Sequence, residues 1–166
     1  MPQSISDDRN TTADLNCGSA PLEDNVFVAD FEGFRFPNEQ FRHADHIRLA
    51  WIYLRQYDYT VAEERMRRGI HGFACHLGAS HKYHATITIA WMRLVNIAVQ
   101  LSSRIDDFGD FVHAHSWLLS KDAVFEFYSR ALLMSDSARA SWVEPDLKPI
   151  PMPPDVRPSE TQAAIL

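Results

Sequence analysis

The chain has 166 residues, of which 46% are apolar and 23% charged, and this size and composition suit one globular domain with its own core. A formal net charge of −6 disfavours nucleic-acid binding, because neutralising phosphates requires a basic face. The longest apolar segment is interrupted by Arg93, Asn96 and Gln100, so no stretch is long enough to span a bilayer, and neither nucleic acid nor membrane is an expected partner.

The first 25 residues are polar, have no hydrophobic period and are expected to form a mobile leader. They lack the basic start and the apolar core of a secretory signal, which predicts a cytoplasmic protein. The two cysteines, Cys17 and Cys75, form no disulfide framework and are expected to stay reduced.

Residues 26–36 combine a short apolar run with phenylalanines that alternate with charged residues on either side of Gly33. This pattern fits either a short strand or an extended segment that anchors aromatic side chains on the core. Since no second strand pattern is present to pair with it, the extended segment is favoured.

Three amphipathic helices are predicted next. The first ends near residue 56 and begins at 39 or at 44, according to whether His43 lies in its first turn or in the preceding loop. Thr60 and Glu63 have the spacing of a capping box, which starts a second helix that Gly78 ends. The third helix covers about 81–103, with Ser80 as its cap, and its wide apolar face predicts a central position.

The rest of the chain predicts shorter elements and a proline-rich end. A fourth helix ends near Leu119, a fifth follows Ser120, and Ser135 caps a short turn through Trp142. Six prolines exclude helix between 145 and 158, so this part should run extended and strap across the bundle. The predicted fold is therefore an all-α, single-domain bundle of about five helices, with a leader at 1–25, a helical domain at 26–144 and a proline-rich extended tail at 145–166.

Histidines carry the main indication of function. The chain has eight, and His43 and His46 are three apart at the start of the first predicted amphipathic helix, while His84 lies at the start of the third. Neutral imidazole is a common ligand of zinc, copper and iron, and catalytic zinc sites have three protein ligands and an open position. These three residues predict a site for one divalent metal ion (iron, zinc or copper), with His115 as a reserve fourth ligand.

Three residues close to these histidines are the candidate catalytic residues, namely Asp45, Tyr83 and Thr88. Asp45 can serve as a fourth ligand or hold one imidazole in a fixed tautomer. The hydroxyl of Thr88 can bind a ligand or return a hydrogen bond to its own helix. Lys82 can bind an anionic substrate or lie in solvent.

These patterns favour a metal-dependent enzyme that acts on a small molecule. A non-catalytic metal-binding or ligand-binding helical protein is the alternative. The same histidines also fit a metal-free acid–base site, or a structural role in which His43 caps a helix and His46 is hydrogen-bonded inside the bundle.

Three segments carry a resemblance to a known set of proteins; they are FRHADHIRLAWIYL, KYHATIT and YSRALLMSDSARASWVEPDLKPIP. Over residues 41 to about 151 the chain resembles a set of small, uncharacterised bacterial helical proteins with FxHxDHxRxAWxYL and KYHxTxT motifs. The resemblance implies that the two histidine motifs form one site, and it supplies no activity. An acidic residue of that set is replaced by Ala85 in this chain, so an additional ligand or base is absent.

Overall fold

The computed structural model describes residues 21–37 and 40–151, and this part of the chain is helical and contains no strand. The predicted all-α fold is confirmed. The α-helices are α1 (Pro21–Glu32), α2 (His43–Gln56), α3 (Tyr59–His76), α4 (Ala85–Leu101), α5 (Phe108–Ala114), α6 (Arg130–Leu133) and α7 (Asp136–Ala140). Three short 3₁₀-helices, η1 (Ser80–Lys82), η2 (Ser116–Leu119) and η3 (Lys121–Glu126), connect them.

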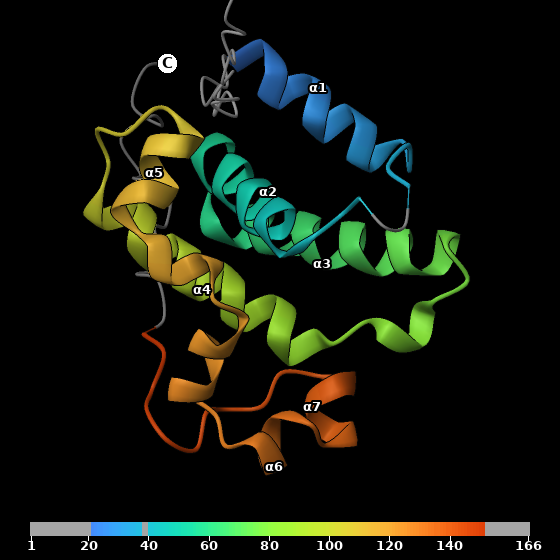
Figure 1. Cartoon of the computed structure of the whole chain (residues 1–166). Helices are drawn as coiled ribbons and strands as arrows, with labels where there is room; N and C mark the ends of the chain where they lie inside the picture. The colour runs from blue at the N-terminus through green and yellow to red at the C-terminus, as the bar shows by residue number, and fades with distance from the viewer. Residues whose placement is uncertain (1–20, 38–39, 152–166) are drawn as a thin grey trace, which may run out of the picture.

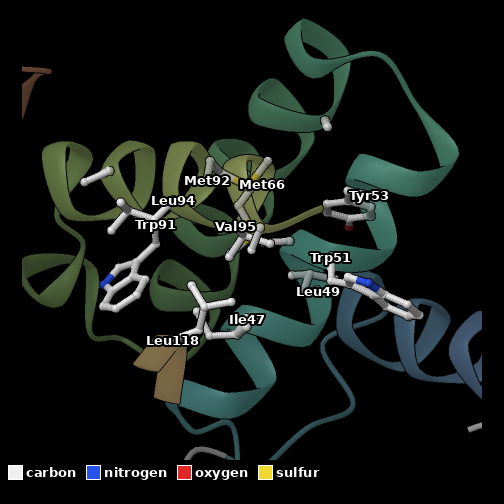
Figure 2. Close-up of a cluster of buried hydrophobic side chains, with 14 of the residues drawn as sticks. Ile47, Leu49, Trp51, Tyr53, Met66, Trp91, Met92, Leu94, Val95 and Leu118 are labelled. Carbon is white, nitrogen blue, oxygen red and sulfur yellow. The ribbon is translucent and has the colours of Figure 1, made fainter. Parts of the chain in front are cut away.

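The core lies where α2, α3 and α4 pack against one another (Figure 1). Figure 2 shows side chains of α2 meeting Met66 of α3 and a row of residues on α4, with Leu118 of η2 closing one side. Each fully buried side chain of this kind contributes roughly 1.5 to 3 kcal/mol relative to exposure. As its apolar face predicts, α4 is central.

The segment before α2 corrects two predictions. Residues 21–32 form α1, so the first part of the expected extended segment (26–32) and the end of the expected leader are helical; residues 1–20 lie outside the described residues. Phe27 and Phe31 are one turn apart and buried, and acidic residues occupy the first turn, where the helix dipole favours them. Asp24 of this helix forms a half-buried ion pair with Arg48 of α2 at 2.6 Å, which fixes α1 to the bundle.

Three predicted starts of helices also differ from the structure. Ser80, the predicted cap of the third helix, begins η1, and α4 starts at Ala85 with His84 as its cap. The cap of α3 is Asp58, whose side chain accepts a hydrogen bond from the Val61 backbone at 2.9 Å, so Thr60 lies inside the helix. Ser120 makes no side-chain capping bond, and a 3₁₀-helix follows it in place of the predicted fifth α-helix. Serine caps at Ser129 and Ser135 start the short helices α6 and α7 instead.

The proline-rich segment lies against the bundle as predicted, as far as it is described. Leu147 donates its backbone N–H to Phe127 O at 3.0 Å, Asp146 accepts from Ser129 N at 2.7 Å, and Ile150 is buried. Residues 152–166 lie outside the described residues. None of the helices in the described ranges has the length and apolar character needed to cross a membrane.

Candidate functional site

The two histidine motifs meet at one pocket of about 670 Å³, which we call the histidine pocket. The starts of α2 and α4 form one part of it, and α3, η3 and α6 complete it. Its walls are mainly apolar, with Met66, Ile70, Ile87, Trp91, Val124, Phe125 and Leu133 among them. Its polar groups are Arg42, His43, His46, Lys82, His84, Thr88 and Lys121.

His84 lines the pocket but uses both of its ring nitrogens to hold the fold. It is the N-cap of α4, where Nδ1 accepts a hydrogen bond from Ile87 N at 3.2 Å. Nε2 must then carry the proton, which it donates to Leu133 O at 2.8 Å. Burial lowers the pKa of His84, and this favours the neutral tautomer that both bonds require.

His43 keeps one nitrogen uncommitted. Nε2 lies 2.8 Å from Leu118 O, and since a carbonyl only accepts, Nε2 is the protonated nitrogen and Nδ1 keeps a lone pair. No described residue forms a hydrogen bond with Nδ1. The ring packs edge-on against Trp91 at a centroid distance of 4.6 Å. Burial lowers its pKa, and the nearby Lys121 charge lowers it further.

His46 has the same arrangement with the nitrogens exchanged. Nδ1 donates to Arg42 O at 2.8 Å, which leaves the Nε2 lone pair with no hydrogen-bond partner in the described part of the chain. The ring lies against Phe41 at a centroid distance of 4.6 Å. Burial is the main cause of its lowered pKa, to which the charges of His43 and Lys121 add. Two neutral imidazoles with free lone pairs therefore line one pocket.

The predicted catalytic residues are distributed differently. Asp45 accepts a hydrogen bond from Arg42 N at 2.8 Å and so caps α2; it is not among the described residues that line the pocket. Tyr83 is likewise outside the lining, with its ring against His71 at 5.0 Å. Thr88 does line the pocket, but its hydroxyl donates to His84 O at 3.0 Å, one turn back in α4.

The described residues contain no group of three His, Cys, Asp or Glu side chains placed to hold a metal ion. The predicted ligands His43, His46 and His84 do not form such a group. His84 would have to lose its capping bond or its bond to Leu133 O before it could offer a lone pair to a metal ion. The reserve ligand His115 is hydrogen-bonded to Ser102 Oγ at 3.0 Å, beyond the far end of α4. The bound metal itself stays a prediction.

Lys121 lines the pocket and was not among the site residues predicted from the sequence. It comes from η3, far along the chain from both motifs, and no period or spacing connects it with them. A signal was nevertheless present, because the whole chain has only three lysines, and Lys82 and Lys121 both line this pocket.

A second hollow of similar size, about 630 Å³, lies between the end of α1 and α3. Its lining includes Glu32, Val61, Glu64, Arg65 and Arg68, and we call it the mixed-charge hollow. It contains no histidine among its described lining residues.

Comparisons with protein-family models, with curated proteins and with solved structures gave no match. The resemblance to the bacterial proteins with the two histidine motifs thus stays a prediction. Fold and site together define an all-α protein with a largely apolar pocket between two helix starts.

Proposed function

We propose that this protein binds a small molecule in the histidine pocket and that His43 and His46 accept a proton or a hydrogen bond from it. The observation that carries the proposal is the different commitment of the three histidines. His84 has both nitrogens bonded to backbone, whereas His43 Nδ1 and His46 Nε2 have no hydrogen-bond partner among the described residues.

The pocket's dimensions and lining support this role. Small-molecule sites typically enclose about 300 to 1,000 Å³ between apolar walls with a few polar groups, and the histidine pocket has that size and that lining. The lowered pKa values of His43 and His46 keep both imidazoles neutral at pH 7, the form that acts as a base. Acid–base chemistry on a bound molecule needs this arrangement and no metal ion.

The metal-dependent enzyme predicted from the sequence is the second candidate, and one observation favours it. The two free nitrogens of His43 and His46 belong to side chains in one pocket, and two imidazoles can hold an ion whose other positions are filled by water or substrate. Elemental analysis of protein purified without an affinity tag separates the two candidates. One equivalent of bound metal that His43→Ala removes supports the metal enzyme, and its absence supports the metal-free pocket.

Carbethoxylation with diethyl pyrocarbonate, mapped by mass spectrometry, tests the proposal because the reagent attacks an imidazole nitrogen that has a free lone pair. His43 and His46 should react and His84 should not. The apolar dye N-phenyl-1-naphthylamine should protect His43 and His46 and leave the exposed His81 reactive as an internal control.

Two matched variants locate the dye. Ile87→Trp fills the histidine pocket and should abolish both dye binding and protection, whereas Val61→Trp fills the mixed-charge hollow and should change neither. Dye binding that persists in Ile87→Trp and disappears in Val61→Trp would move the small-molecule site to the other hollow.

A further inference from the structure

We propose that the ligand of the histidine pocket is a small organic anion, namely a carboxylate that carries an apolar group; this rests on the proposed function. The sign of charge around the pocket is the first observation. Although the chain has 22 acidic residues and a net charge of −6, no carboxylate is among the described residues that line the pocket. Three cations are there, from Arg42, Lys82 and Lys121.

Within residues 21–37 and 40–151, the two lysines have no acidic partner. Neither ammonium forms an ion pair or a hydrogen bond with the described residues, whereas the chain's remaining lysine, Lys148, pairs with Glu126 at 3.4 Å. Several arginines elsewhere are paired with carboxylates, such as Arg48 with Asp24 and Arg65 with Glu32. Two of the three lysines line one apolar pocket that has no carboxylate among its described lining residues, and together they produce a positive field that attracts an anion.

The positive charge of Lys121 lowers the pKa of both His43 and His46, which line the same pocket. A carboxylate that binds here has no proton to donate, so His43 Nδ1 and His46 Nε2 can meet it only after taking up a proton, which the acid form of the ligand supplies as it ionises. The lining also includes the apolar side chains of Ile87, Trp91, Phe125 and Leu133, which suit an alkyl or aromatic group of the same molecule. A carboxylate with an apolar tail suits both the cations and the apolar side chains of this lining.

A matched pair of ligands tests this inference. Octanoate and 1-octanol share an apolar chain and differ in the charge of the head group, and each can displace N-phenyl-1-naphthylamine from the protein. Octanoate should displace the dye at a concentration at least about tenfold lower than 1-octanol, and this preference should shrink as salt is added.

Lysine variants assign the preference to the pocket. In the double variant Lys82→Met/Lys121→Met, octanoate and 1-octanol should displace the dye at equal concentrations once each is corrected for the dye affinity measured for that variant. Lys148→Met, which removes a lysine from the strap, should keep the full preference.

The outcomes separate this inference from the proposed function. If octanoate and octanol act alike on the unaltered protein, or if the double variant keeps the preference, the anion inference fails while dye binding in the pocket keeps the proposed function. If the dye does not bind, or if Ile87→Trp does not affect it, the proposed function fails first.

Discussion

The two hollows of this protein have nearly equal volumes, about 630 and 670 Å³, and differ in how their polar groups are used. In the mixed-charge hollow Glu32 accepts hydrogen bonds from Tyr53 at 2.9 Å and Arg65 at 3.2 Å, and Glu64 pairs with Arg67 at 3.8 Å. In the histidine pocket two lysines and two imidazole nitrogens have no such partner among the described residues.

A hollow is a candidate binding site when polar groups that line it have no hydrogen-bond or ion-pair partner within the protein. Glu32 and Arg65 in the mixed-charge hollow stabilise the contact between α1 and its neighbours, since Glu32 ends α1 while Tyr53 and Arg65 belong to α2 and α3. The histidine pocket has one group of that kind, His84, and several that are free to recognise a ligand. Stability and binding should therefore respond to different substitutions in the two places.

The largest effect is expected on acidification, because three histidines act in the same direction. Burial lowers the pKa of His43, His46 and His84 in the folded protein below the ordinary value of about 6.5. As pH falls through that value the unfolded chain takes up protons before the folded one, so the free energy of unfolding decreases. Stability is full above about pH 7 and should decline towards pH 5, as urea unfolding at stepped pH would show.

The acid prediction has an internal control. His81→Ala removes an exposed histidine and should leave the pH profile of stability unchanged. A profile that is flat, or that rises, between pH 7 and 5 would mean that these imidazoles are not held neutral by burial.

His84→Ala should destabilise the protein by roughly 2 to 4 kcal/mol. It removes the N-cap of α4 and leaves Leu133 O without its hydrogen-bond donor in a buried position. Chemical denaturation measures this loss, with His81→Ala expected to lie within about 0.5 kcal/mol of the unaltered protein. An equally small loss for His84→Ala would remove the distinction between His84 and the other two pocket histidines.

In the mixed-charge hollow, Glu32→Ala should cost about 1 to 2 kcal/mol, because Tyr53 and Arg65 lose a charged acceptor. Glu64→Ala breaks only a long, exposed pair with Arg67 and should change stability by less than about 0.5 kcal/mol. Both variants should bind anions in the histidine pocket as before. Anion binding that falls with Glu32→Ala would show that the hollows are not independent.

The sequence predicted the parts of the fold that have a helical period and a clear end. The apolar faces of 43–56, 59–76 and 85–101 are such cases, and the three helices form the core. The helix α1 was missed because Val26, exposed, interrupts the pattern of the buried Phe27 and Phe31. Between 116 and 126 the chain forms two 3₁₀-helices without a side-chain cap, and Ser129 then starts α6, which a pattern of apolar spacing alone does not reveal.

The candidate site was predicted in its location and not in its detailed chemistry. The spacing of His43, His46 and His84 led to the two helix starts that line the pocket. The partners that fix His43 and His84, Leu118 O and Leu133 O, come from distant segments of the chain, and any residue type supplies a backbone carbonyl. The use of both His84 nitrogens was for that reason invisible in the sequence.

His43 and His46 each have one ring nitrogen without a hydrogen-bond partner among the described residues, whereas both ring nitrogens of His84 are hydrogen-bonded to the backbone. Long-range ¹H–¹⁵N correlation spectra of histidine-labelled protein at pH 7, recorded with and without octanoate, test it most directly. We expect Nε2–H tautomers for His43 and His84 and an Nδ1–H tautomer for His46. Octanoate should change the ¹⁵N chemical shifts of His43 Nδ1 and His46 Nε2 and leave those of His84 unchanged. A His84 signal that responds to octanoate while those of His43 and His46 do not would contradict it.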